Sequence, residues 1–315
     1  MNPSCAPIPV ESVPRAAEPA LPAQEEHSLA TDLSELTKAR LTMMVLVTTL
    51  AGFALAGRGV FDWSKLIHTL VGTALVAVCS SILNQALERD TDALMRRTQT
   101  RPFVTRRLPL RETILAGLVL GAIGLAELVW FVNGLTALLS AATLVIYVFV
   151  YTPLKRVSEI NTLIGAIPGA LPPLIGATAA TGHFSVEGWT LFALLAFWQL
   201  PHFYAIAWMY RDDYEAAGLR MVSVNDPFGA HTGTHAVVSA LILLPVSLLP
   251  AWIGHAGIFY AVTAGFLSLV FLAAAIRFAQ HPDRRHARRL FLTSIIYLPL
   301  VLTALAIDIP IQRLL

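Results

Sequence analysis

Long apolar runs separated by short polar segments make up most of this chain from residue 41 onward. Each run approaches the roughly 20 residues that an α-helix needs to cross the hydrocarbon core of a bilayer. A helix suits that environment because it satisfies its backbone hydrogen bonds internally. The pattern therefore predicts an all-α fold, a polytopic membrane helical bundle of about nine transmembrane helices, near residues 41–57, 67–87, 114–132, 135–151, 161–180, 189–210, 235–253, 257–278 and 290–308.

Basic residues gather in alternate loops between the predicted helices. Arginines are dense after the second and eighth apolar runs, and Lys155 and Arg156 follow the fourth. The loops at 133–134, 181–188 and 254–257 contain no Lys or Arg. Basic loops stay on the cytoplasmic side of a membrane. We therefore expect a multi-pass protein of a bacterial inner (plasma) membrane, with a cytoplasmic N-terminus and the C-terminus outside.

The first 35 residues differ in composition, being rich in Pro, Ala and Glu and lacking an apolar run. Such a segment cannot bury enough apolar surface to fold, so we expect a disordered cytoplasmic tail at 1–35 and one membrane domain at 36–315. The two cysteines of the chain argue against a disulfide framework or a metal–thiolate cluster. The net charge of +2 is close to neutral and the basic residues lie beside the predicted membrane helices, so we do not expect nucleic acid as a partner. The apolar runs make the lipid bilayer an expected partner.

Three polar side chains, Asn84, Glu88 and Asp92, stand four residues apart at the end of the second apolar run. On a helix they stack along one face, and we call them the polar ladder. Its carboxylates repel each other unless a cation lies between them, and oxygen-only ligands suit Mg²⁺. Arg97 and Arg101 follow directly, and their guanidinium groups match the geometry of phosphate. The combination indicates a metal–diphosphate site, with a solvated, charged helix end as the alternative.

A second polar cluster, residues 210–218, follows the sixth apolar run and includes Arg211, Asp212 and Asp213. Adjacent aspartates cannot both face one way on a helix, but at a helix end one can reach a metal while the other caps the helix or meets solvent. If both clusters face a shared cavity, two acidic poles hold one diphosphate through Mg²⁺. An ordinary surface loop is the alternative interpretation.

The sixth apolar run contains polar residues that are costly in lipid: Gln199 and His202 flank Pro201 and follow Trp198. Gln199 and His202 are three apart and are expected to share a face. The functional interpretation is contact with a polar group of a large apolar substrate, such as a metal-bearing macrocycle bound through a neutral imidazole. Hydrogen-bonded packing within the bundle is the alternative.

These residues also carry a family resemblance. The spacing of the polar ladder with the downstream Met and Arg residues resembles the first signature of the membrane-embedded aromatic prenyltransferases, the UbiA superfamily: Asn84, Glu88, Asp92, Met95, Arg97, Thr98 and Arg101. Four further blocks resemble the heme-prenylating branch of that superfamily, the heme O synthases: 151–156, 168–176, 198–203 and 213–218. The resemblance runs from about residue 38 to residue 300.

The resemblance implies a nine-helix bundle around a central, laterally open cavity. Its implied reaction transfers a farnesyl group from farnesyl diphosphate to the 2-vinyl group of heme b, giving heme o and diphosphate. The implied cofactor is Mg²⁺, and heme b is a substrate rather than a cofactor. Further implied partners are heme A synthase or terminal oxidase assembly factors.

The implied site residues fall into three overlapping groups. Metal binding and catalysis are expected of Asn84, Glu88, Asp92, Asp212 and Asp213, with Asp213 as the catalytic member of the second cluster. Diphosphate binding is expected of Arg97, Arg101, Tyr151, Lys155, Arg156 and Arg211. Tyr151 either orients phosphate, stabilises the cation through its ring, or simply packs at a helix end. Heme binding is expected of Trp198, Gln199 and His202.

Two departures from the family pattern matter. Glu88 stands where many members have Asp, and the second cluster offers adjacent Asp212 and Asp213 rather than widely spaced aspartates. Two other functions remain open: prenylation of another aromatic acceptor, namely a quinone precursor or chlorophyllide, and non-enzymatic heme handling or transport. Polar residues repeated through the midplane in two halves would favour a transporter, whereas here they gather on one side.

Overall fold

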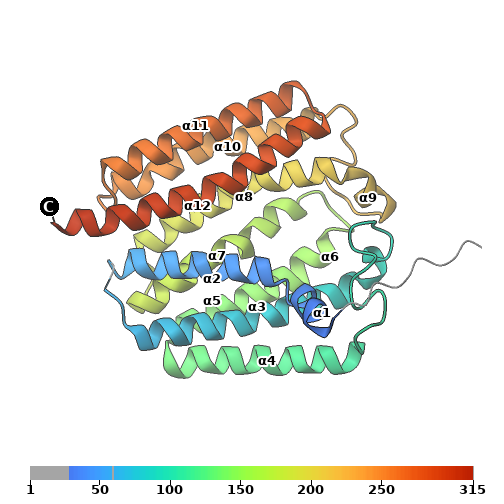
Figure 1. The fold of residues 1–315 in the computed structure, drawn as a ribbon, viewed down its shortest axis with the longest axis horizontal. Helices are drawn as coiled ribbons and strands as arrows, with labels where there is room; N and C mark the ends of the chain where they lie inside the picture. The colour runs from blue at the N-terminus through green and yellow to red at the C-terminus, as the bar shows by residue number, and fades with distance from the viewer. Residues whose placement is uncertain (1–27, 59, 315) are drawn as a thin grey trace, which may run out of the picture.

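The computed structural model describes residues 28–58 and 60–314, and Figure 1 shows them as an elongated bundle of helices. Within these residues there is no strand, and nine helical segments are long and apolar enough to cross a membrane. The predicted all-α membrane bundle is thereby confirmed. The elements are α1 (Leu29–Leu36), α2 (Ala39–Ala56), α3 (Trp63–Asp92), α4 (Leu110–Phe131), α5 (Gly134–Val145), the π-helix η1 (Ile146–Tyr151), α6 (Thr152–Leu154), α7 (Asn161–Thr181), α8 (Val186–Met209), α9 (Arg211–Ala216), α10 (Ala230–Trp252), α11 (Ile258–Gln280) and α12 (Arg284–Leu314).

Helix α1 occupies the last part of the predicted disordered tail. Residues 1–27 of that tail lie outside the described residues, but helical structure begins at Leu29 rather than after residue 35. Ser28 caps the helix, because its hydroxyl accepts a hydrogen bond from the Thr31 N–H. Asp32 pairs with Arg107 at 2.9 Å across the end of the bundle. This tertiary contact, invisible in local composition, explains the difference from the predicted boundary.

Two tightly packed groups of helices build the bundle (Figure 1), and the first contains α2, α3, α4, α5 and α7. Helices α2 and α7 approach so closely that a Cβ at Gly176 would lie 1.8 Å from the Thr49 carbonyl oxygen, and one at Gly52 would lie 1.9 Å from that of Pro173. Helices α10, α11 and α12 form the second group. Helix α8 lies between α7 on one side and α10 and α12 on the other, so its faces contact both groups.

Three polar segments meet at one end of the bundle, which we call the polar end: residues 93–109, 155–160 and 210–229 (Figure 1). Met95 of the first segment packs against Tyr214 and Leu219 of the third. The Arg220 N–H donates to the Lys155 carbonyl at 2.7 Å, which ties the third segment to the second. The structure thus brings both predicted acidic clusters to one end, while α12 finishes at the opposite end (Figure 1).

Candidate active site

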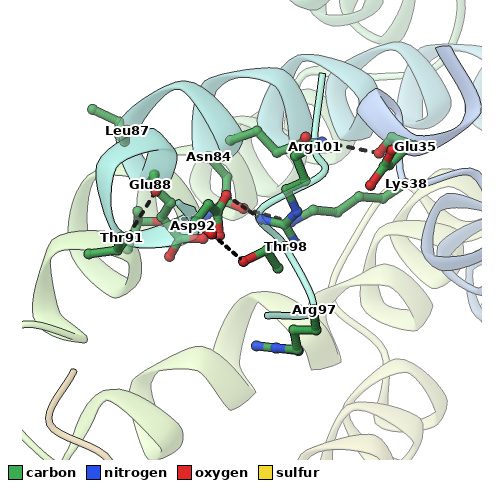
Figure 2. Close-up of polar contacts among 12 residues, drawn as sticks. Glu35, Lys38, Asn84, Leu87, Glu88, Thr91, Asp92, Arg97, Thr98 and Arg101 are labelled. Atoms are coloured by element: carbon green, nitrogen blue, oxygen red, sulfur yellow. Dashed lines mark hydrogen bonds and ion pairs between the residues drawn. The ribbon is translucent and has the colours of Figure 1, made fainter. Parts of the chain in front are cut away.

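The polar ladder occupies the last three turns of α3, at the polar end (Figure 2). Asn84 is fully buried, Asp92 is 1% exposed and Glu88 is 9% exposed. Charged groups at such depth require partners, because burial removes the water that would otherwise stabilise them. The ladder is therefore a buried polar site and not the solvated helix end of the alternative interpretation.

Each ladder residue bonds to a cation from a different part of the chain. Lys155 Nζ lies 2.7 Å from Glu88 Oε1, and Arg101 lies 2.5 Å from Asp92 Oδ2. Lys38 Nζ donates to Asn84 Oδ1 at 2.6 Å. Burial lowers the pKa of Lys155, but the Glu88 carboxylate and the hydroxyls of Tyr151 and Tyr147 together raise it above its ordinary value. The Lys155 amine consequently stays protonated.

Lys38 is a site residue that sequence reasoning missed. It joins α1 to α2 with a left-handed backbone (φ 47°), which is uncommon for residues other than glycine. The Gln85 amide fixes the preceding turn by donating to the carbonyls of Glu35 (3.1 Å) and Leu36 (2.8 Å). Gln85 and Asn84 are adjacent on α3. The same turn of α3 therefore holds the end of α1 through Gln85 and binds the Lys38 amine through Asn84. The available signal was a lone lysine just before the first apolar run.

Two tyrosines line the site from the π-helix η1. The Thr152 N–H bonds the Tyr147 carbonyl, five residues back, and Pro153 has no N–H to resume the α-helical pattern. Tyr147 and Tyr151 stack with ring centroids 5.6 Å apart. Lys38 Nζ also donates to the Tyr147 hydroxyl at 3.1 Å, and Lys155 Nζ lies 4.5 Å from the Tyr151 ring centre. Both rings therefore contact the cations that hold the ladder.

The remaining predicted diphosphate ligands lie outside these contacts. Arg97 lies apart from the ladder (Figure 2) and donates to the Tyr214 hydroxyl at 2.9 Å. Arg156 reaches the Leu87 carbonyl at 3.5 Å, and Arg211 lies over the Trp208 ring. Of the six predicted residues, the structure brings Arg101, Tyr151 and Lys155 to the ladder; the diphosphate-binding roles of all six stay predictions.

The ladder fits a hard cation through its oxygens. Asp92 Oδ1 is buried and has no hydrogen-bond partner among the described residues, which leaves a lone pair free for a ligand. Glu88 and Asn84 supply further oxygens, the atoms that Mg²⁺ prefers. No group of three or more His, Cys, Asp or Glu in the described part of the chain is placed to hold a metal.

Neither carboxylate of the second acidic cluster, Asp212 or Asp213, joins those of Glu88 and Asp92 to form such a group. The Asp212 side chain is 94% exposed and pairs with its neighbour Arg211 at 3.6 Å. Asp213 is half-buried on the first turn of α9. The adjacency of the two aspartates explains this: consecutive residues on a helix point about 100° apart, so only one of them can face inward.

His202 lies in the interface between α8 and α12. The Ser294 hydroxyl donates to the Phe291 carbonyl at 2.6 Å, so at 2.7 Å it accepts from His202 Nδ1–H. That assignment leaves His202 Nε2 with a free lone pair. The imidazole stacks on the rings of Trp198 and Phe291, whose centroids lie 5.4 and 4.9 Å away. Trp198 Nε1 donates to the Ser294 carbonyl at 2.9 Å.

Gln199 does not share this environment, contrary to the expectation of a common face. Its amide is buried and donates to the Ala166 carbonyl of α7 at 2.7 Å. A Cβ at Gly169 would lie 2.2 Å from Gln199 Oε1, so the glycine makes room for the amide. Helix α8 is enclosed between α7 and α12. Residues three apart on a helix differ by about 60° around its axis, and this is enough for Gln199 to contact α7 while His202 contacts α12. The structure thus shows Gln199 tying α8 to α7, and its role in heme binding stays a prediction.

Solved structures with the same arrangement of helices support this description of the fold. One, described as "Structural and mechanistic insights into the biosynthesis of Digeranylgeranylglyceryl phosphate synthase in membranes", superposes with a TM-score of 0.76 at 15% identity, covering 89% of this chain and 98% of that one. A UbiA homolog from Archaeoglobus fulgidus bound to GPP and Mg²⁺ gives a TM-score of 0.59 at 16% identity, covering 87% and 99%. At these identities the likeness concerns the fold alone.

Sequence comparison gives the family. The UbiA prenyltransferase family matches residues 45–298, which include the ladder, both tyrosines and His202. The protoheme IX farnesyltransferase of Solibacter usitatus is 41% identical over 288 residues, covering 89% of this chain and 99% of the relative. With most of both chains aligned at this identity, the protein described above is a member of the UbiA prenyltransferase family.

Proposed function

We propose that this chain transfers a farnesyl group from farnesyl diphosphate to the 2-vinyl group of heme b, giving heme o and diphosphate. The activity named for the Solibacter usitatus relative supports the pair of substrates. The observation that carries the proposal is the buried ladder in which every residue is held by a cation. Its two carboxylates face three cations, Lys38, Arg101 and Lys155, so the site has an excess of positive charge suited to an anionic leaving group.

The ladder would hold Mg²⁺ through Asn84, Glu88 and Asp92. When bound, the ion supplies positive charge that stabilises the departing diphosphate. The unpartnered Asp92 Oδ1 supports this assignment, as does the description of the Archaeoglobus fulgidus homolog as bound to GPP and Mg²⁺. From the second cluster we propose Asp213 rather than Asp212, because the Asp212 side chain already faces solvent.

The chain's own groups then account for the transfer. Lys38, Arg101 and Lys155 bind the diphosphate oxygens as the C–O bond to the allylic carbon breaks. The electron-rich faces of Tyr147 and Tyr151 stabilise the allylic cation. The heme vinyl carbon attacks that cation, water adds to the new carbocation, and the released proton leaves with diphosphate. No protein nucleophile is required.

The proposed reaction is tested with purified protein, heme b, Mg²⁺ and farnesyl or geranylgeranyl diphosphate, followed by mass spectrometry. Heme carrying one farnesyl group and one added water is the expected product, and chelating the metal should abolish it without unfolding the protein. Parallel incubations supply hydroxybenzoate or chlorophyllide as acceptor. Prenylation of one of those and not of heme would assign the chain to a different acceptor, and no product from any acceptor would favour non-enzymatic heme handling.

We propose that His202 contacts heme through its free Nε2 atom. Replacing His202 by Ala should raise KM for heme about tenfold, because a buried interaction with a polar group is lost. Binding of farnesyl diphosphate should be nearly unchanged, since the ladder and its cations hold it elsewhere. Heme binding is followed by visible absorption, and diphosphate binding by competition with a non-hydrolysable analogue. Equal loss of both would indicate a structural role for His202, and wild-type heme use would reject the contact.

We further propose a bacterial inner membrane location with the polar end and the N-terminus in the cytoplasm, and handover of product to heme A synthase or oxidase assembly factors. A cysteine at Gln99 should then be labelled by an impermeant thiol reagent only from the inside. A cysteine at His183, in the loop between α7 and α8, should be labelled only from the outside. His183 is chosen because its neighbour Gly182 has a positive φ of 80°, where a side chain is strained. Labelling of both from one face contradicts this topology.

A further inference from the structure

A concentrated basic patch at the start of α12 plays no part in the mechanism above. Four exposed arginines and one leucine line a hollow of about 430 Å³: Arg284, Arg285, Arg288, Arg289 and Leu292. None of these arginines pairs with a carboxylate of the described residues. The neighbouring carboxylate of Asp283 is already occupied, since it accepts from the His286 N–H at 2.8 Å and pairs with His286 Nδ1 at 2.9 Å. The patch is therefore free to bind an anion.

The helical register places part of this patch beside the His202 environment. Arg288 and Arg284 precede Phe291 by three and seven residues, so the three side chains lie on one stripe of α12. Along the axis, Arg288 is about 4.5 Å and Arg284 about 10.5 Å from Phe291. Phe291 itself stacks on the His202 imidazole at 4.9 Å. A flat ligand resting against Phe291 and His202 would thus meet the arginines at its edge.

We propose that Arg284 and Arg288 bind the propionate carboxylates of the heme substrate. The inference rests on the proposed function and extends it to the acceptor. Heme is a flat apolar ring with two carboxylates on one edge, and guanidinium groups match carboxylates in a bidentate geometry. Anchoring that edge at the polar end holds the ring in one orientation and leaves the opposite, vinyl-bearing edge free for the reaction. The patch is thereby a specificity element for the acceptor.

The test compares heme b with its dimethyl ester, in which both carboxylates are masked. The wild-type protein should use heme b with a lower KM than the ester. The double variant Arg284→Gln, Arg288→Gln should raise KM for heme b about tenfold or more and remove the preference over the ester, with KM for farnesyl diphosphate unchanged. The matched control, Arg106→Gln with Arg111→Gln, also removes two exposed charges from the polar end and should keep the preference.

Three outcomes would overturn the inference. Equal use of both acceptors by the wild-type protein is one, and a persistent preference in the double variant is another. The third assigns the patch to lipid headgroups: the variant then loses activity toward both acceptors alike in vesicles containing phosphatidylglycerol, and equals wild type in pure phosphatidylcholine. If the wild-type protein prenylates neither acceptor, the proposed function fails, and binding of heme b and its ester, followed by absorption, decides the role of the arginines separately.

Discussion

Replacing Asp92 by Asn should lower kcat for prenyl transfer by about 100-fold or more, because the substitution removes the buried carboxylate that pairs with Arg101 and that we propose as a metal ligand. The side chain keeps its size and the helix its packing, so membrane insertion should be unaffected. The measurement is single-turnover product formation at saturating farnesyl diphosphate across a range of Mg²⁺ concentrations. A rise in the Mg²⁺ concentration needed for half-maximal activity should accompany the loss of rate.

Asp90 supplies the matched control for this experiment. It lies two residues away on the same helix, is exposed and forms no ion pair with the described residues. Asp90→Asn changes the charge of α3 by the same amount but does not touch the ladder, so it should retain wild-type rate and metal dependence. Undiminished product formation by Asp92→Asn, or equal losses in the two variants, would refute the assignment of the ladder as the metal site.

The ladder and the helices could be predicted from sequence because both depend on local periodicity. Apolar runs of membrane length leave few alternatives to helices, and the structure places nine spanning segments close to the expected ranges. A spacing of four residues puts Asn84, Glu88 and Asp92 on one face of any helix. Arg101 and Lys155 could be predicted as diphosphate ligands because they follow helix ends on the same side as the ladder, whereas their ion pairs with Asp92 and Glu88 are seen only in the structure.

The parts that sequence did not supply depend on contacts between distant segments. Asn84 and Tyr147 are 63 residues apart, and the π-helix that carries the tyrosine has no apolar periodicity of its own. Gln199 and His202 appeared to share a face, but the faces of α8 are divided between α7 and α12. Local composition places α1 in the tail, since the contact between Asp32 and Arg107 joins residues 75 positions apart. Periodicity within one segment cannot reveal such pairings.

Replacing Lys38 by Asn should strongly reduce the use of farnesyl diphosphate, because Lys38 supplies one of the cations at the ladder. Asn is among the residues that best tolerate a left-handed backbone, so Lys38→Asn should preserve the turn between α1 and α2 while removing the amine that reaches Asn84 and Tyr147. We expect kcat/KM for farnesyl diphosphate to fall about 10- to 100-fold, the effect of losing a charge-assisted hydrogen bond in a buried site. KM for heme should stay unchanged, and Lys38→Arg should restore part of the activity.

Arg40 is the control for this prediction, because it is exposed on the first turn of α2 and forms no hydrogen bond with the described residues through its side chain. Arg40→Gln should therefore behave as wild type. If Lys38 only anchored α1, the loss in Lys38→Asn would extend to heme and to protein stability, and Gln85→Ala, which frees the carbonyls of Glu35 and Leu36, would reproduce it. A selective loss toward farnesyl diphosphate in Lys38→Asn, with partial rescue by arginine, requires the charge itself to act on the diphosphate.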